Sequence, residues 1–149
     1  MCSSDLLKMC TLGIVYATKT RHSKKIAEAI GKTLNIKAEN VSGRPVPGDV
    51  DLLFIVGGIY GGKSLPELLK FVKSLDAGKI KRAALVTSCA SKKQGQDSIR
   101  KLLQAKGIEV MDEIICQGSF LFIGFGHPNK TDIQEAVDFA IRLSAEVCE

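Results

Sequence analysis

The feature that most constrains the fold is the stretch of residues 11–30, where an apolar run leads through a polar loop into an amphipathic helix. Leu12 and Ile14 belong to the apolar run, and Ile26 and Ile30 recur at helical spacing. The loop between them is rich in hydroxyl groups and positive charge. Because the first turn of a helix presents N–H groups without intrahelical partners, this arrangement predicts a site for an anion such as phosphate.

The rest of the chain alternates short apolar runs with helical patterns. After the first run at residues 11–16, strands are predicted at residues 36–41, 52–56 and 83–87 and within 110–116. Helices are predicted at residues 23–34 with Ser23 as N-cap, from about 65 to Gly78, around Ile99 up to Gly107, and after Pro128. This order predicts an α/β domain in which a doubly wound, five-stranded parallel sheet carries helices on both faces.

Three loops follow predicted strands at their carboxyl ends, at residues 17–23, 57–63 and 87–95. Ligands of open parallel sheets bind at this edge, where the strand order reverses. If the first strand lies beside the third, the three loops are neighbours. The sequence therefore predicts one binding site built from all three.

Length and composition indicate the class of protein. A chain of 149 residues with 45% hydrophobic and 25% charged residues predicts one globular domain, which we place at residues 11–149 after a leader at residues 1–10. No apolar run could span a bilayer and no signal peptide is evident, so we expect a cytoplasmic protein with no membrane partner. The net charge of +5 comes from scattered basic residues with few aromatic residues among them, which argues against a nucleic-acid partner.

The five cysteines are odd in number and show no Cys-x-x-Cys spacing. In a chain expected to be cytosolic, this predicts free thiols and no metal site. Cys10 and Cys116 border or lie in apolar runs and are predicted to be small core residues, whereas Cys2 and Cys148 lie near the chain ends. For Cys89, in the third loop, both a packed side chain and a reactive thiol remain open.

The three loops resemble those of the flavodoxin family. The first, Thr18-Lys19-Thr20-Arg21-His22-Ser23, has hydroxyl residues at the spacing of the family's phosphate loop. The second, Val56-Gly57-Gly58-Ile59-Tyr60-Gly61-Gly62, resembles the loop that packs on the flavin ring, with Tyr60 at the position of an aromatic residue. The third, from Ser88 onward, occupies the other flavin-contacting position. The resemblance covers residues 11–143, is closest to the short-chain type, and implies the strand order 2-1-3-4-5.

The resemblance implies that FMN is the cofactor and that the loops above contact it, with no catalytic residue of the protein's own. The implied cofactor-binding residues are Thr18, Lys19, Thr20, Arg21, His22 and Ser23 in the first loop, Gly58, Ile59, Tyr60, Gly61 and Gly62 in the second, and Ser88, Cys89, Ala90 and Ser91 in the third. Hydroxyl and N–H groups at a helix start suit the phosphate, and an aromatic face with small glycines suits the flat flavin ring.

The chain departs from the family pattern in three ways. Arg21 and His22 stand where the family usually has glycine and asparagine, the third loop lacks the aromatic residue that often covers the flavin, and the net charge is positive where flavodoxins are typically acidic. Positive charge near the ring should stabilise the anionic reduced flavin and raise its potential. The redox protein partners are then expected to present acidic docking faces.

Three functions remain open on this sequence. The first is an FMN-binding electron-transfer protein that shuttles electrons between redox partners. The second is an FMN-dependent oxidoreductase of the quinone or porphyrinogen type, for which an open third loop leaves room, although no acid/base cluster is evident. The third is a flavodoxin-fold domain that has lost flavin binding.

Overall fold

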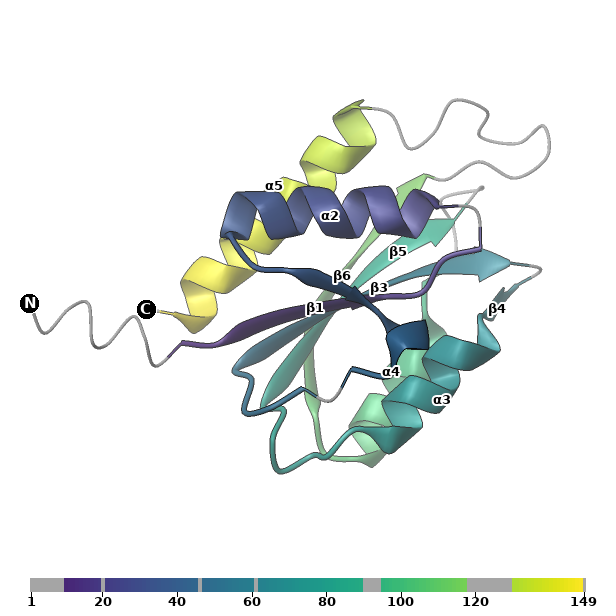
Figure 1. The fold of residues 1–149 in the computed structure, drawn as a ribbon, viewed down its shortest axis with the longest axis vertical. Helices are drawn as coiled ribbons and strands as arrows, with labels where there is room; N and C mark the ends of the chain where they lie inside the picture. Colours follow the sequence, from purple (N-terminus) through teal and green to yellow (C-terminus); the bar gives the residue numbers. More distant parts are fainter. Residues whose placement is uncertain are drawn as a thin grey trace, which may run out of the picture.

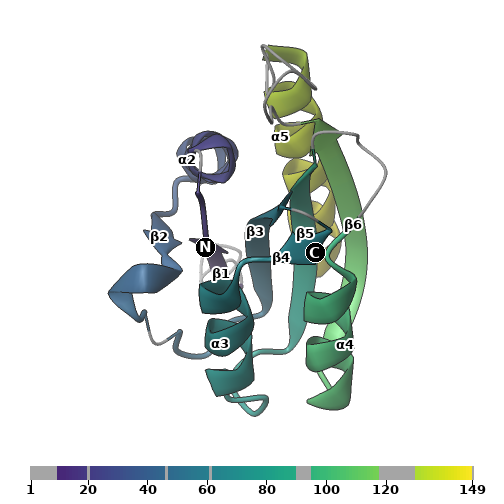
Figure 2. The same ribbon diagram turned by 90° about the vertical axis from the view of Figure 1, so that its right-hand side faces the viewer.

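The computed structural model describes residues 10–19, 21–45, 47–60, 62–89, 95–117 and 130–148. A single sheet lies between two layers of helices (Figures 1 and 2). Its strands are β1 (Leu12–Tyr16), β2 (Ala38–Asn40), β3 (Leu52–Tyr60), β4 (Lys63–Ser64), β5 (Arg82–Cys89) and β6 (Glu109–Gln117). The helices are α2 (His22–Leu34), α3 (Pro66–Ser74), α4 (Asp97–Ala105) and α5 (Lys130–Val147), with a 3₁₀ turn, η1 (Val41–Gly43), after β2.

The sheet has the order β2-β1-β3-β5-β6, and all neighbours along this path are parallel. The predicted doubly wound topology is therefore confirmed, as is the order in which the second strand lies outside the first. All five predicted parallel strands are present, and the structure adds a sixth, the two-residue strand β4, which pairs antiparallel with the end of β3. The reversal of strand order falls between β1 and β3, which pair directly.

Strands β3 and β5 run further than the apolar runs that predicted them. Gly57 and Gly58 were expected in a loop, but they continue β3 and pair with Thr87 and Ser88 of β5. Tyr60 then closes a hairpin with Lys63. Hydrogen bonding to neighbouring strands continues through buried glycine and polar residues beyond the apolar runs, so hydropathy alone sets these strand ends too early.

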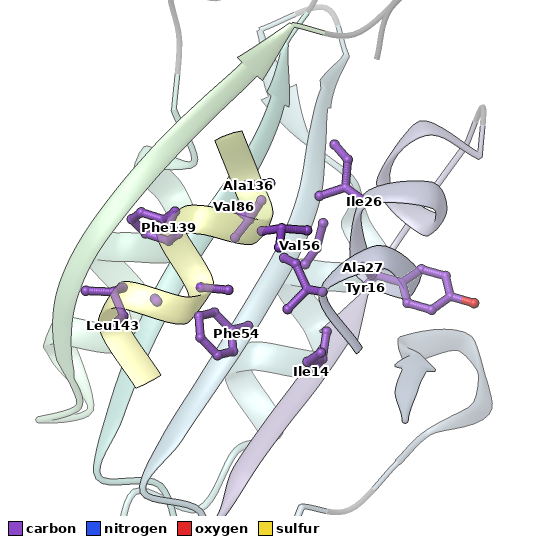
Figure 3. Packing of buried hydrophobic residues seen from close by; sticks show 14 of the residues in the cluster. Ile14, Tyr16, Ile26, Ala27, Phe54, Val56, Val86, Ala136, Phe139 and Leu143 are labelled. Carbon is purple, nitrogen blue, oxygen red and sulfur yellow. The ribbon is translucent and has the colours of Figure 1, made fainter. Parts of the chain in front are cut away.

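The sheet separates two hydrophobic cores because successive side chains of a strand point to opposite faces. On β3, Phe54 and Val56 face the layer of α2 and α5, whereas Leu53 and Ile55 face α3 and α4. Figure 2 shows the two helix layers, and Figure 3 shows the first core, to which β3 contributes Phe54 and Val56 and α5 contributes Ala136, Phe139 and Leu143. Residues 52–58 of β3 are all buried, which confirms the prediction of a central strand buried on both faces.

Two predicted helix signals are wrong. Ser23 is not the N-cap of α2, because Arg21 occupies that position and Ser23 lies buried inside the first turn. Gly78 does not end α3, which stops four residues earlier at Ser74. The Gly78 N–H donates to Asp76 Oδ1 at 2.8 Å, so this glycine belongs to a separate side-chain-capped turn.

Cys10 and Cys148 form a disulfide, with a Cα–Cα distance of 5.4 Å across 138 residues of sequence. The prediction of free thiols is wrong for this pair, since β1 begins near the point where α5 ends, at the same end of the sheet (Figure 1). Cys116 is buried and forms no disulfide, as predicted, and the same holds for Cys89 among the described residues. Within the described ranges, no helix is long and apolar enough to cross a membrane.

Candidate functional site

The first loop joins β1 to α2 through a backbone conformation that is uncommon for a side-chain-bearing residue. Arg21 has φ 69° and ψ 0°, in the left-handed region, and the next residue begins the right-handed helix. This conformation costs a non-glycine residue about 1–2 kcal/mol. Successive N–H groups in a left-handed and then a right-handed residue form a concavity that binds anions. Such strain, where it persists, often marks a functional position.

Two hydroxyl groups of this loop are buried and have no hydrogen-bond partner among the residues that the structure describes. Thr18 Oγ1 and Ser23 Oγ are inaccessible to solvent, and Ser23 as a whole is 0% exposed. Thr20, the third predicted hydroxyl residue, lies outside the described residues. Because buried polar atoms in folded proteins are almost always paired, unpartnered hydroxyls at a helix start are the donors that a bound phosphate would require.

The electrostatics of the first loop also favour an anion. Lys19, Arg21 and Lys25 are exposed there, and α2 has no acidic residue in its first turn. Burial, and in second place the positive charge of Lys25, lower the pKa of His22 below its usual value. His22 is therefore mainly neutral at pH 7, so the positive charge of the loop comes from the lysine and arginine side chains.

Tyr60, at the end of β3, reaches across to the first loop. Its hydroxyl oxygen accepts a hydrogen bond from Lys19 N at 3.3 Å, and Lys19 Nζ lies 5.9 Å from the centre of the ring. The ring covers Gly58, where a Cβ atom would come within 2.7–2.8 Å of three Tyr60 side-chain atoms, so only glycine fits beneath it. The structure thus brings the predicted first and second loops together.

The remaining residues of the second loop follow from the β3–β4 hairpin. Ile59 is half-buried and pairs with Ser64, and Gly62 has φ 80°, which a tight hairpin turn requires. Gly61 lies outside the described residues. Sequence reasoning missed Ser64, whose Oγ is buried and unpartnered, because nothing in a lone serine after the glycines distinguishes it from a surface residue.

Of the third loop, the structure places Ser88 and Cys89 as the last two residues of β5. Both are buried, and Ser88 pairs with Gly58 of β3, so this strand end also adjoins the second loop. Ala90 and Ser91 lie outside the described residues. All three loops therefore contribute described residues to one edge of the sheet, the carboxyl edge.

A buried polar network behind this edge was not predicted. Thr87 Oγ1 and Gln96 N both donate to Glu113 Oε2, at 2.6 and 2.7 Å, and Arg100 Nη2 donates to Glu113 Oε1 at 2.8 Å. The one available signal was the acidic pair Asp112-Glu113 inside the predicted strand at residues 110–116. A carboxylate within an apolar run is expected to have partners, but the sequence does not say which.

A separate groove of about 540 Å³ lies between η1 and α3. Val41, Pro45 and Phe71 supply its apolar side chains, and Arg44 and Lys70 also line it. None of its lining residues belongs to the three loops, so we do not assign it to the predicted site.

Comparison with known proteins gives the family. A profile of the flavodoxin domain matches residues 13–135, which is most of the chain. The chain belongs to the flavodoxin family. None of the curated protein sequences matches it. Flavin-binding electron transfer is the activity that membership of this family supports.

Solved structures share the flavodoxin fold at low sequence identity. A flavodoxin from the domain Archaea has a TM-score of 0.73 at 18% identity, covering 93% of this chain and 99% of its own. A short-chain flavodoxin associated with a non-canonical PDU bacterial microcompartment has a TM-score of 0.69 at 22% identity, with 93% and 99% covered. Rubredoxin oxygen:oxidoreductase from Desulfovibrio gigas has a TM-score of 0.70 at 11% identity, covering 96% of this chain but 38% of the enzyme. At these identities the similarity establishes the fold.

Proposed function

We propose that this flavodoxin-family protein binds FMN and acts as an electron-transfer protein between redox partners. The observation that carries the proposal is the pair of buried, unpartnered hydroxyls, Thr18 Oγ1 and Ser23 Oγ, at the start of α2. A phosphate group at this helix start would complete their hydrogen bonding. The left-handed Arg21 supports the same proposal, because it turns the neighbouring N–H groups into an anion-binding concavity.

The ring end of the proposed site is the edge formed by Gly58, Tyr60 and Ser88. Gly58 lets the Tyr60 ring pack directly against the backbone, and Tyr60 offers an aromatic face at this edge. When bound, FMN would supply the capacity to accept and donate electrons singly or in pairs. The chain's own residues would bind the phosphate, orient the ring and adjust its potential through local charge.

The positive charge around this edge supports the proposal that partners present acidic docking faces. Lys19, Arg21, Lys25 and Lys63 are all exposed around the first two loops. Complementary charge accelerates association, and its effect weakens as ionic strength rises. We therefore expect electron transfer to an acidic partner to slow as salt is added, whereas electron transfer to a basic partner would become faster.

A flavin-binding titration tests the proposal. We expect the purified protein to take up FMN with one-to-one stoichiometry and to acquire a bound-flavin visible spectrum. Ser23→Ala should weaken FMN binding by about tenfold or more, because a hydrogen bond to a charged group contributes about 1.5–3 kcal/mol. Its binding of riboflavin, which has no phosphate, should be unchanged.

The matched control is Ser144→Ala. Ser144 Oγ is also buried and unpartnered, but it lies on α5, away from the three loops. Its loss should leave FMN binding as in the wild type. Absence of flavin uptake by the wild type would favour a domain that has lost flavin binding, and rapid turnover of a quinone with NAD(P)H as the sole reductant would favour an FMN-dependent oxidoreductase.

We also propose a cytoplasmic location. In a reducing cytoplasm, Cys10 and Cys148 would be present as thiols, whereas an oxidising compartment would preserve their disulfide. Trapping thiols by alkylation in intact cells distinguishes the two cases. A fully oxidised pair would contradict a reducing cytoplasm.

A further inference from the structure

Glu113 on β6 holds both ends of the chain segment that joins β5 to α4. Its Oε2 atom accepts hydrogen bonds from Thr87 Oγ1, near the end of β5, and from Gln96 N, at the start of α4. Its Oε1 atom accepts from Arg100 Nη2, one turn into α4. The Glu113 side chain is only 10% exposed, so these three donors replace most of its contact with water.

The network extends inward to the glycines at the end of β3. Gln96 is 0% exposed, and its Nε2 donates to Ile55 O at 3.3 Å and Val86 O at 3.2 Å. A Cβ atom on Gly57 would come within 2.9 Å of Gln96 Oε1, so the amide packs directly on this glycine. Thr87, which donates to Glu113, is also the strand partner of Gly57.

The carboxylate is packed as closely as it is hydrogen-bonded. A side chain at Gly95 would collide with the carboxylate of Glu113, so the backbone before α4 lies directly against it. The contacts of Glu113 therefore reach the end of β5 directly, through Thr87, and the end of β3 through Gln96. These are the two strand ends that carry Ser88 and Gly58, which pair with each other.

We propose that Glu113 is a positioning residue of the flavin site. It acts through Thr87 and Gln96, which hold the Gly57–Gly58 and Ser88–Cys89 strand ends in one geometry before the ligand arrives. Binding then requires less ordering of the site, which raises affinity for the ring. The inference rests on the proposed FMN binding, and it concerns the ring end of the site, whereas Ser23 concerns the phosphate end.

Glu113→Gln tests the inference with two ligands. The neutral amide cannot accept all three hydrogen bonds, because its NH₂ group must face at least one donor. We expect the variant to weaken FMN and riboflavin by the same factor, about tenfold, because both ligands carry the ring. Loss of one negative charge should also move the midpoint potentials of bound FMN to less negative values.

Thr87→Val separates geometry from charge and covers the case in which Glu113→Gln does not fold. It removes one hydroxyl at nearly constant shape, and it should weaken both ligands by a common factor of several-fold. Glu109→Gln is the matched control, since Glu109 lies on the same strand but forms an exposed ion pair with Arg82. It should leave affinities and potentials unchanged.

The two possible failures are distinguishable. Unchanged affinities for both ligands in folded Glu113→Gln and Thr87→Val would overturn the positioning role while leaving FMN binding intact. A loss confined to FMN, with riboflavin unaffected, would also overturn it, because the defect would then lie at the phosphate end. Failure of the wild type to bind either ligand would overturn the proposed function and this inference together.

Discussion

The two ends of the sheet differ in how their polar groups are paired. At the amino end, Thr11 N donates to Asp51 Oδ2 at 2.7 Å, and Lys81 Nζ lies 3.1 Å from Asp51 Oδ1. At the carboxyl end, the hydroxyl oxygens of Thr18 and Ser23 have no hydrogen-bond partner among the described residues. The disulfide lies at the amino end as well. Of the five buried side-chain atoms without a hydrogen bond in the described part of the chain, four belong to the carboxyl end: Thr18, Ser23, Ser64 and Gln96.

This difference separates stability from function within one sheet. Partnered polar groups and a covalent link stabilise the folded state at the amino end. Unpartnered hydroxyls and a left-handed arginine cost stability at the carboxyl end, and they persist where a ligand can satisfy them. Substitutions at the amino end should therefore change the free energy of unfolding and leave flavin affinity alone.

The largest effect should come from the disulfide. Cys148→Ser opens a loop of 138 residues, and loop-closure entropy predicts a loss of about 5 kcal/mol in the free energy of unfolding. Urea denaturation with and without reductant measures it, and reductant should have no further effect on the variant. FMN affinity should stay the same, and a large loss of affinity would contradict the claim that the amino end affects only stability.

The next effect should come from Gly57, which lies where the core meets the carboxyl end. In Gly57→Ala the new methyl group would lie 2.6 Å from Leu68 Cδ2 and 2.9 Å from Gln96 Oε1, both of them buried. Overpacking of this kind costs about 1–3 kcal/mol. Unlike the disulfide variant, it should lower stability and FMN affinity together, as measured by denaturation and flavin titration. A loss of stability without a loss of FMN affinity would show that Gly57 affects folding only, as the residues of the amino end do.

Asp51→Asn should cost about 1–2 kcal/mol at neutral pH, because the charged carboxylate accepts a hydrogen bond from Thr11 N and pairs with Lys81. The hydrogen bond from Thr11 and the charge of Lys81 lower the pKa of Asp51, in spite of its burial. A lowered folded-state pKa means that this stabilisation is complete above the pKa of the unfolded chain and is lost as pH falls through the lower folded value.

Denaturation over a pH series measures this effect. The difference between wild type and Asp51→Asn should be constant from pH 7 to about 5 and should shrink in more acidic solution. A difference that grows as the pH falls would contradict the assignment. FMN affinity at pH 7 should be the same for both proteins.

The smallest effect should be an increase in the free energy of unfolding. Arg21→Gly removes the cost of holding a residue with a side chain in the left-handed conformation. Glycine's greater freedom in the unfolded chain offsets part of this gain, so the free energy of unfolding should rise by about 0.5–1 kcal/mol. Arg44→Gly is the matched control, because Arg44 is also left-handed, with φ 52°, and lies outside the three loops. Both variants should gain stability, and only Arg21→Gly, which removes a cation from the phosphate loop, should weaken FMN binding.

Much of this fold could be predicted from local pattern. The apolar runs and helical spacings identified the five parallel strands and four helices, and the described residues of the loops after the first, third and fourth of these strands lie at one edge, as expected. The predicted strand ends were less accurate at Gly57, Gly58 and Ser88, because these buried residues have no large apolar side chain and are identified as strand only by their pairing.

The spacing of apolar residues along the chain is enough to predict the doubly wound sheet, and residue types alone reveal the hydroxyl-rich loop that leads into α2. The sequence could not determine the Cys10–Cys148 disulfide or the contacts of Glu113 with Thr87 and Gln96. These join residues far apart along the chain and leave no periodic signal. These contacts become apparent only in the folded protein, because each depends on which strand and helix ends the packed sheet brings within bonding distance.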